Sequence, residues 1–340
     1  MNESYVKASH PVASTDSHDH SSEVTHPRVS VVIPAYNRQD HIREAIDSVL
    51  AQDFDGSIEI IVVDDGSTDC TAEIARSYRD QVTVLSTCFN QGPAAARNIG
   101  IRASHADIIA LLDSDDIMLP NRIATQISYL ESNPEVGVVF AGSVNAQSHY
   151  ADAFHSECDA PSYPRKWTKL NYPREMLFRA YLGNQSTTSI RKKALLQVGL
   201  YNTSFRILED WELMVRLAGV TRMSYYNGAL AQIRTQHHNR SNSDLAHGAQ
   251  LGVAVTEHVL HSTTFLSHQE RDMMVERHRQ SLRWHLFRSY LAWGGPSLRP
   301  LIAQYDHYLP ARAKYKWLVV SYLPVSVIRC VLWLRRKRYF

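Results

Sequence analysis

The sequence predicts an α/β fold in which a mostly parallel β-sheet is flanked by helices and followed by a C-terminal helical extension. Two observations predict it. Short apolar, β-branched segments alternate with amphipathic helical segments over residues 29–116, and strands that alternate with helices usually pair in parallel through right-handed crossovers. Each of these strands also ends in a polar cluster. Because the carboxyl ends of parallel strands meet at one edge of a sheet, we expect the clusters to share one cleft.

The first two expected strands flank a helix. Residues 29–33 are apolar and β-branched, and we expect Pro34 to end this strand because proline cannot donate to a central ladder. Residues 40–52 carry apolar side chains at helical spacing. A second strand is expected over residues 59–63, and the Ser, Thr and Asp residues after it suit the N-cap of a helix near residues 71–78.

The last strand of the series leads into an acidic turn. A third strand is expected over residues 82–85 and a helix over residues 94–103. Residues 108–112 are continuously apolar, which suits a central strand covered on both faces. The turn 113–116 that follows holds three carboxylates, which repel one another unless a cation or strong donors lie between them. This turn is therefore either a divalent-metal site for a phosphorylated ligand or an ordinary polar turn.

Composition and absent motifs exclude several classes of protein. The chain is globular in composition, and its formal net charge of +2 gives no general case for nucleic acid. The cysteines form no Cys-x-x-Cys pair, which argues against a structural zinc site or a disulfide scaffold and suits a reducing cytosol. Neither a Gly-x-Gly-x-x-Gly fingerprint after the first strand nor a Gly-Lys-Ser/Thr loop is present. A calcium loop starting at Asp113 is excluded, because Met118 and Ala124 occupy the places that require Gly and Glu.

Four motifs follow one another along the chain. They are Val-Ser-Val-Val-Ile-Pro-Ala-Tyr-Asn (29–37), Ile-Ile-Val-Val-Asp-Asp-Gly-Ser-Thr-Asp (60–69), Asn-Gln-Gly-Pro-Ala-Ala-Ala-Arg-Asn-Ile-Gly (90–100) and Leu-Leu-Asp-Ser-Asp-Asp (111–116). Taken in this order, they resemble the family 2 glycosyltransferases of GT-A fold, a Rossmann-like α/β fold, and the resemblance extends over about residues 28–240.

A later segment, residues 208–218, is similar to the acceptor side of the same family, where a Glu-Asp pair opens a helix under the acceptor site. The residues themselves agree with a helix here. Leu213, Leu217 and Val220 predict an apolar helix face, and the acidic pair lies at the end that favours negative charge.

The resemblance implies a nucleotide-sugar donor bound at the strand ends. Two of the implied residues have structural alternatives: Asp65 could only cap the following helix, and Arg97 could be an ion-pair partner on a helix surface. The residues implied to bind the donor are Pro34, Ala35 and Tyr36 along the nucleoside, Asp65 at the base, Arg97 near the base and phosphates, Asp113 facing the ribose and the metal, and Ser114.

The resemblance also implies a metal and a general base. Asp115, together with Asp113, would ligate Mg²⁺ or Mn²⁺ bridging the diphosphate, and Asp210 would take the proton of the acceptor. Asp210 could instead simply be the negative charge that the start of its helix prefers. Asp64 and Asp116 have the pattern of turn-building residues or of groups behind the ligands, and we predict neither as a direct ligand.

Two further segments keep alternatives open. His237 or His238 matches a family position from which a histidine reaches the metal or diphosphate, but Ile233 replaces the usual Tyr and the spacing is longer, so a surface loop is the alternative. The irregular stretch 145–173 is rich in aromatic residues, including Trp167, which either stack on sugar rings or pack within the loop.

The sequence divides into three expected regions. The N-terminal stretch is rich in Ser, Thr and His, lacks an apolar core and has no secretory signal, so we expect disorder there. The regions are a tail (1–27), a catalytic domain (28–240, with a nucleotide-sugar half 28–118 and an acceptor half 119–240) and a helical C-terminal region (241–340, with helices over about 246–265 and 269–291).

The C-terminal end, residues 316–338, is amphipathic and basic and closes on the run 335–338 of four Lys and Arg residues. This pattern suits a helix lying in a membrane interface, with the basic run at anionic headgroups. A packed C-terminal helix or a homodimer contact are the alternatives. A true span is disfavoured because Pro324 and Arg329 interrupt an apolar run of marginal length.

The resemblance thus implies an inverting, metal-dependent glycosyltransferase. It would move a sugar from a nucleoside-diphosphate sugar, with UDP favoured over GDP and dTDP, to a hydroxyl of a glycan or lipid-linked acceptor. We expect a role in cell-surface polysaccharide synthesis, in the cytoplasm and peripheral on the inner face of the cell membrane. A nucleotidyltransferase and a non-catalytic nucleotide-sugar binding module are the alternatives; the first lacks its basic Gly-rich loop, and Asp210 disfavours the second.

Overall fold

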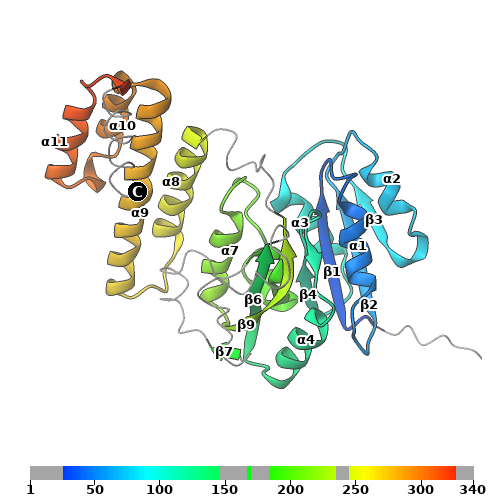
Figure 1. The fold of residues 1–340 in the computed structure, drawn as a ribbon. Coiled ribbons are helices and arrows are strands. Elements are labelled where there is room, and N and C mark those ends of the chain that lie inside the picture. Colours follow the sequence, from blue (N-terminus) through cyan, green and yellow to red (C-terminus); the bar gives the residue numbers. More distant parts are fainter. Residues whose placement is uncertain (1–25, 146–166, 170–183, 235–244, 327–340) are drawn as a thin grey trace, which may run out of the picture.

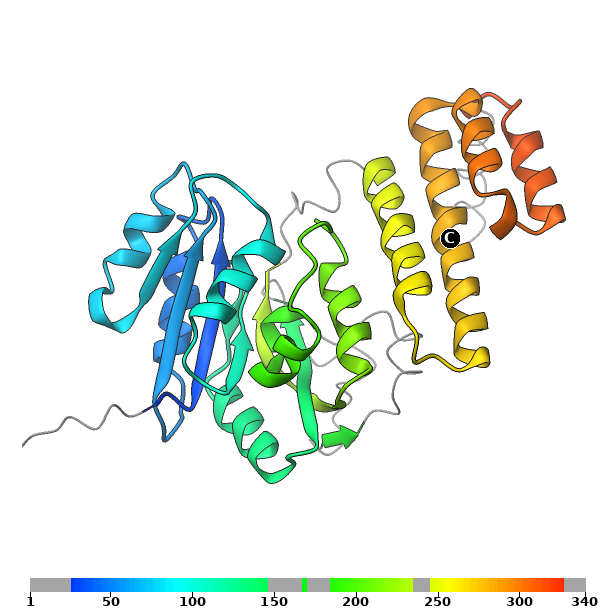
Figure 2. The same cartoon turned by 180° about the vertical axis from the view of Figure 1, so that it is seen from behind.

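The computed structural model describes residues 26–145, 167–169, 184–234 and 245–326. One nine-stranded sheet carries helices on both faces. A helical region lies at the end of the molecule opposite to the strands β1, β2 and β3 (Figures 1 and 2). The strands run in the order β3-β2-β1-β4-β8-β6-β9-β5, with β7 paired to β9 off this path. The α/β fold with a parallel-rich sheet and a C-terminal helical extension is therefore confirmed.

The parallel part of the sheet is the part that the sequence predicted. It consists of β1 (Val29–Ala35), β2 (Ile58–Asp64), β3 (Thr83–Ser86) and β4 (Ile108–Leu111). The second half is mixed: β8 is antiparallel to β4 and β6, whereas β6 and β9 are parallel. Its strands are β5 (Ile117–Met118), β6 (Val136–Asn145), β7 (Trp167–Lys169), β8 (Ser189–Arg191) and β9 (Arg222–Ile233).

Strand β1 does not end at Pro34, and this prediction was wrong. The strand continues to Ala35, and Pro34 pairs with Val63 of β2. The other neighbour, β4, pairs with β1 only up to Val32. At Pro34, β1 therefore has β2 as its only neighbour. No carbonyl of β4 lies there to need the backbone N–H that proline lacks, so the strand can continue through Pro34.

Each face of the sheet is covered by helices. Along β1, Val31 and Ile33 point into one core, and Val32 points into the other, so the strand is buried on both sides. The first face is covered by α1 (Ile42–Leu50), α2 (Thr71–Arg76) and α4 (Arg122–Ser132), and the second by α3 (Pro93–Ala103), α6 (Lys192–Gln197) and α7 (Glu209–Ala218).

Helix α7 confirms only part of the predicted apolar face. Leu213 and Leu217 are fully buried against the second face of the sheet. Val220 was predicted to share this face, and that prediction was wrong. The helix ends at Ala218, and Val220 lies beyond it with 39% of its surface exposed.

The C-terminal helices have a core of their own, and it includes Trp211 and Val215 of α7. Helix α9 begins with a capping box in which Ser267 and Glu270 satisfy each other's backbone amides. The elements are α8 (Leu245–Ser262), α9 (His268–Trp293), α10 (Leu298–Gln304) and α11 (Ala311–Val320); short 3₁₀ turns occur at Arg79–Gln81, Gln185–Thr187, Gly295–Ser297 and Asp306–Tyr308.

Two alternatives from the sequence can be decided in part. Trp167 stacks on Tyr129 at 3.9 Å between ring centroids and lies 5.2 Å from Tyr226, so it packs within the protein. At the C-terminus, Trp317 and Val320 of α11 pack against the helical core, as the packed-helix alternative expected. In the described part of the chain no helix is long and apolar enough to cross a membrane, and the rest of the basic end, residues 327–340, lies outside that part.

The C-terminal helices contain a buried histidine that makes their stability depend on pH. His278 of α9 is fully buried, and its Nδ1 atom lies 2.9 Å from Thr256 Oγ1 of α8. Burial, with smaller contributions from His261 and His307, lowers the pKa of His278 to about 4. Between about pH 6.5 and about pH 4, His278 therefore binds a proton in the unfolded chain but not in the folded chain.

We therefore predict that the C-terminal helices keep their full stability above about pH 6.5 and lose about 2–3 kcal/mol as the pH falls to about 4.5. Urea unfolding followed by far-UV circular dichroism at several pH values measures this loss. The variant His278→Gln should lose most of this pH dependence, whereas His268→Gln, at an exposed position, should keep it. An unchanged pH dependence in His278→Gln would contradict the prediction.

Candidate active site

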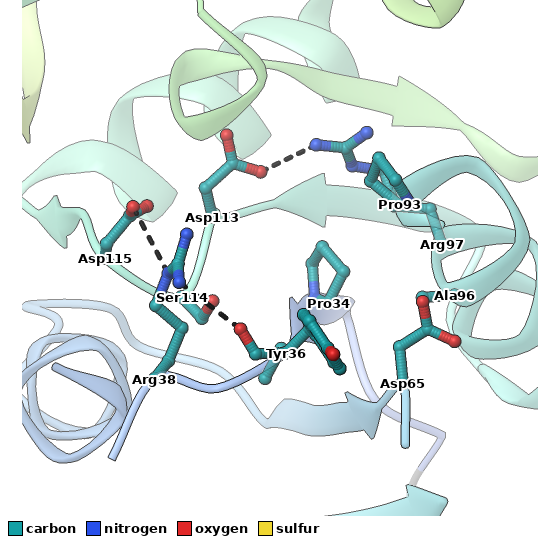
Figure 3. Close-up of a pocket in the computed structure, with 11 residues that line it drawn as sticks. Pro34, Tyr36, Arg38, Asp65, Pro93, Ala96, Arg97, Asp113, Ser114 and Asp115 are labelled. Atoms are coloured by element: carbon teal, nitrogen blue, oxygen red, sulfur yellow. Dashed lines mark hydrogen bonds and ion pairs between the residues drawn. The ribbon is translucent and has the colours of Figure 1, made fainter. Parts of the chain in front are cut away.

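The ends of β1, β2 and β4 and the first turns of α3 line one open cavity of about 210 Å³ (Figure 3). All the residues that the sequence predicted to bind donor or metal at the strand ends line it. The lining residues are Pro34, Ala35, Tyr36, Arg38, Asp65, Pro93, Ala96, Arg97, Asp113, Ser114 and Asp115.

The loops after β1 and β2 are fastened to each other. Asn37 adopts a left-handed conformation with φ of 51°, which asparagine tolerates better than most residues. Its backbone N–H donates to Ser67 Oγ, and its side-chain oxygen accepts from the Thr68 backbone N–H, both at 2.9 Å. Gly66 has a φ of 71°, and a Cβ there would lie 2.7 Å from the Phe89 backbone. These contacts fix the position of Asp65 relative to the end of β1.

Asp65 holds the loop that leads into α3. Its carboxylate is buried and accepts hydrogen bonds from the backbone N–H groups of Gln91 at 2.9 Å and Gly92 at 2.7 Å, and from Thr87 Oγ1 at 3.1 Å. The alternative that Asp65 caps the helix following it in sequence, α2, is contradicted, because its donors precede α3 instead. Asp64, predicted as a turn-building residue, accepts from the Ser67 backbone N–H within its own turn.

Arg97 connects two acidic groups that are far apart in the sequence. Its Nη2 atom lies 2.7 Å from Asp113 Oδ1, and its Nη1 atom lies 3.0 Å from Glu209 Oε1, 112 residues away. The guanidinium also lies over the ring of Tyr201, 5.5 Å from its centroid. Arg97 is only 4% exposed, which contradicts the alternative of an ion pair on a helix surface. Burial acts to lower the pKa of Arg97, but the charges of Asp113 and Glu209 outweigh it and keep the group charged.

The acidic turn after β4 is held by a second arginine. Arg38 Nε lies 3.4 Å from Asp115 Oδ2 (Figure 3). The same side chain donates to the Asn37 backbone carbonyl. Burial, and then the charge of Asp113, raise the pKa of Asp115. Asp113 and Asp115 therefore repel each other, although each has an arginine on one of its oxygens.

Asp116 points away from the cavity and into the protein. It accepts hydrogen bonds from Ser186 Oγ and from the Arg234 backbone N–H at 3.0 Å. Burial, followed by the charge of Asp113, raises the pKa of Asp116 to about 7. Its contacts agree with the expected role behind the ligands, since they tie the acidic turn to the end of β9.

Arg122 lies buried behind the same turn. Its Nη2 atom donates to the backbone carbonyls of Leu111 at 2.9 Å and Thr188 at 3.0 Å. Burial lowers the pKa of Arg122 to about 9, and the charges of Asp116 and Asp113 act against this. No motif in the sequence pointed to Arg122, Arg38 or Ser186, and Glu209 was expected at the start of α7 but not as a partner of Arg97.

Asp210 lies in the first turn of α7, next to Glu209, and its carboxylate accepts from the Trp211 backbone N–H at 2.7 Å. It is not among the residues that line the cavity. Its neighbour Glu209 is buried, and burial and then the charge of Asp210 raise the pKa of Glu209. The ion pair of Glu209 with Arg97 therefore ties the start of α7 to the cavity wall.

The two predicted histidines, His237 and His238, lie outside the described residues. Arg234, the last described residue before them, is bound to Asp116 through its backbone N–H. Over the described ranges, no group of three His, Cys, Asp or Glu side chains is placed to hold a metal ion.

Comparison with known proteins points to one family. The model of glycosyl transferase family 2 matches residues 30–196. An uncharacterised glycosyltransferase of Rickettsia prowazekii is 32% identical over 223 residues, which are 64% of this chain and 67% of that protein. One of Haemophilus influenzae is 28% identical over 56% of this chain and 61% of its own length. The succinoglycan biosynthesis protein ExoU of Rhizobium meliloti is 33% identical over 55% of this chain and 56% of its own.

Solved structures share the fold. S. aureus TarS 1-349 in complex with UDP-GlcNAc superposes with a TM-score of 0.64 at 17% identity, covering 84% of this chain and 82% of that one. The mannosyltransferase PcManGT of Pyrobaculum calidifontis, in complex with GDP-Man and Mn²⁺, superposes with a TM-score of 0.55 at 17% identity, covering 88% and 85%. Both resemblances support the GT-A fold, since identity this low carries the fold alone.

The contacts of Arg97 predict its contribution to stability. Arg97→Gln would leave Glu209 and Asp113 near each other without their shared cation, and removing one partner of a buried ion pair typically costs about 3–5 kcal/mol. We expect Glu209→Gln to cost less, because Arg97 then still has Asp113. Urea denaturation of both variants and of the double variant gives a coupling energy, which we expect to be at least about 1 kcal/mol. Additive losses would mean that the two side chains do not interact.

Proposed function

The chain belongs to glycosyl transferase family 2, and from this premise we propose that it moves a sugar from a nucleoside-diphosphate sugar to a hydroxyl with inversion at the anomeric carbon. One observation carries the proposal: the residues expected to bind the donor line a single cavity, and one of them, Arg97, forms an ion pair with Glu209, the neighbour of Asp210. UDP is the favoured nucleotide, since the structural neighbour TarS was solved with UDP-GlcNAc. GDP and dTDP are the alternatives.

The nucleoside end of the donor lies along the end of β1. Pro34, Ala35 and Tyr36 form this wall, and Asp65 hydrogen-bonds the base. Asp65 suits this task because its backbone donors hold the carboxylate in one place before the ligand arrives. Ser114 contacts the donor from the acidic turn on the opposite side.

The residues present fit a hard divalent cation. Asp115 is half-buried beside Asp113. Burial and then the charge of Asp113 raise the pKa of Asp115, and a cation would relieve that repulsion. Each carboxylate gives one oxygen to an arginine, so Asp115 and Asp113 would hold Mg²⁺ or Mn²⁺ through the other. Because only two protein carboxylates are at hand, the ion would need further ligands from the donor. When bound, the ion stabilises the negative charge of the departing diphosphate as a Lewis acid.

Asp210 is the general base. An acceptor hydroxyl is a poor nucleophile, so a carboxylate must take its proton as the oxygen attacks. The acceptor oxygen forms its bond to the anomeric carbon while the bond from that carbon to the diphosphate oxygen breaks, and the diphosphate leaves with the electron pair. One such displacement inverts the anomeric centre. Arg97 and Glu209 act as positioning residues, because they fix the first turn of α7 against the donor cavity.

The acceptor is a glycan or a lipid-linked glycan of cell-surface polysaccharide synthesis, at the inner face of the cell membrane. The relative ExoU, a succinoglycan biosynthesis protein, supports this class. The donor side lies within residues 28–118, the acceptor side within residues 119–240, and the helical region begins at about residue 241. The matched part is 61% of the Haemophilus influenzae relative and 56% of ExoU.

Two substitutions separate the proposed roles. Asp210→Asn should lower kcat by about 10²–10⁴-fold and leave donor affinity nearly unchanged, because the amide cannot take a proton. Asp115→Ala should also weaken donor binding in the presence of Mn²⁺. Transfer assays and titration calorimetry with UDP measure the two effects, and Asp80→Asn, at an exposed position, is the matched control. Equal losses of donor affinity in both variants would refute the division of roles.

The identity of the nucleotide and the need for a metal can be tested without knowing the acceptor. We expect UDP to raise the melting temperature of the protein more than GDP or dTDP, and Mn²⁺ to increase that shift. The Mn²⁺ increment should be lost in Asp115→Ala. A larger increase in melting temperature with GDP than with UDP would change the assigned nucleotide. If Mn²⁺ does not alter the increase in the native protein, the metal has no place in the proposal.

A further inference from the structure

Helix α11 exposes an apolar stripe to solvent. Tyr315, Leu318 and Val319 are spaced as i, i+3 and i+4 and therefore lie on one face of α11, and Tyr322 follows in the turn just beyond the end of the helix at Val320. They are 71%, 43%, 44% and 68% exposed. Figures 1 and 2 both place α11 at the outer end of the helical region, away from the sheet. A group of large apolar side chains that stay exposed together usually marks a binding surface.

The opposite side of this segment is packed, which fixes the direction of the stripe. Trp317 and Val320 contact the core of the helical region. Ser321 is buried against Gly295, where an added Cβ would collide with the Ser321 carbonyl oxygen. Just beyond the helix, Tyr290 Oη donates to the Leu323 carbonyl at 2.9 Å. The segment cannot turn its stripe inward without losing these contacts.

The end of the chain that carries the stripe is strongly basic. Residues 298–340 contain nine Lys and Arg residues and a single carboxylate, that of Asp306, in a chain whose formal net charge is only +2. Arg312 and Lys316 are exposed on α11 itself. Arg299 lies over the ring of Tyr322, 4.3 Å from its centroid, and Lys314 pairs with Asp306. The rest of the chain is therefore net acidic, and the charge of this end favours an anionic partner.

The combination of charge and apolar area selects among anionic partners. A second copy of the chain would bring two basic ends together, so repulsion disfavours it. Nucleic acid would engage the cations but would leave Leu318 and Val319 without apolar cover. A lipid surface with anionic headgroups accommodates both, since acyl chains cover the stripe while headgroups meet the flanking cations.

We propose that α11 docks on an anionic lipid surface, with Tyr315, Leu318, Val319 and Tyr322 entering the headgroup boundary and Arg299, Arg312 and Lys316 contacting the headgroups. The helix lies in the plane of the surface because its inner side stays packed on the protein. The basic run 335–338 follows in the sequence and adds charge of the same sign. This docking does not depend on the sugar-transfer reaction, so the two proposals can fail separately.

Flotation of the full-length protein with vesicles tests the docking. The protein should partition onto vesicles of phosphatidylcholine mixed with phosphatidylglycerol, much less onto phosphatidylcholine alone, and less as salt increases. The double variant Leu318→Ser, Val319→Ser should bind at least about tenfold more weakly, and Lys316→Gln about fivefold more weakly. Leu196→Ser and Arg102→Gln change an exposed apolar residue and an exposed cation far along the chain, on α6 and α3, and should bind like the native protein.

Three results would overturn the proposal. The first is equal partitioning of the stripe variants and their controls. The second is binding that does not distinguish anionic from neutral vesicles. The third is a dimer, seen by sedimentation velocity, that the stripe variants abolish, since a second copy of the chain would then cover the stripe.

Discussion

The site depends on one buried cation. Arg97 has almost no contact with water, so its charge is tolerable only because Asp113 and Glu209 meet it at 2.7 Å and 3.0 Å. These two carboxylates come from opposite sides of the site, one from the end of β4 and the other from the start of α7. Satisfying Arg97 therefore fixes the distance between the strand ends and the acceptor-side helix. The position that we propose for the base, Asp210, follows from this constraint.

Helix α7 is held from its other side by the C-terminal helices. Trp211 and Val215 belong to the C-terminal core, and the guanidinium of Arg277 lies 4.8 Å from the centroid of the Trp211 ring. Glu212 pairs with Arg216 within α7 and lies 3.7 Å from His258 of α8. The helix that carries Glu209 and Asp210 is thus packed between the sheet and the helical extension, which makes the extension part of the support of the site.

The local part of this arrangement could be predicted from sequence and the distant part could not. The strand ends that line the cavity were predicted because apolar runs followed by polar clusters are local patterns. Glu209 as the partner of Arg97 was missed, because a contact across 112 residues leaves no local signal. Pro34 was assigned as a strand end by a rule for central strands, and it failed where β1 has only one neighbour. Val220 was assigned by spacing, which cannot locate the end of a helix.

The central claim is that one cavity holds the donor while Asp210 faces its sugar. A crystal structure of the protein with Mn²⁺ and a non-transferable UDP-sugar analogue tests it most directly. We predict that the diphosphate and Mn²⁺ lie at Asp115 and Asp113 and that the nucleobase lies at Asp65. The anomeric carbon should lie within reach of an acceptor oxygen bound to Asp210. A ligand bound away from the ends of β1 and β4, or a sugar with its leaving-group side toward Asp210, would contradict it.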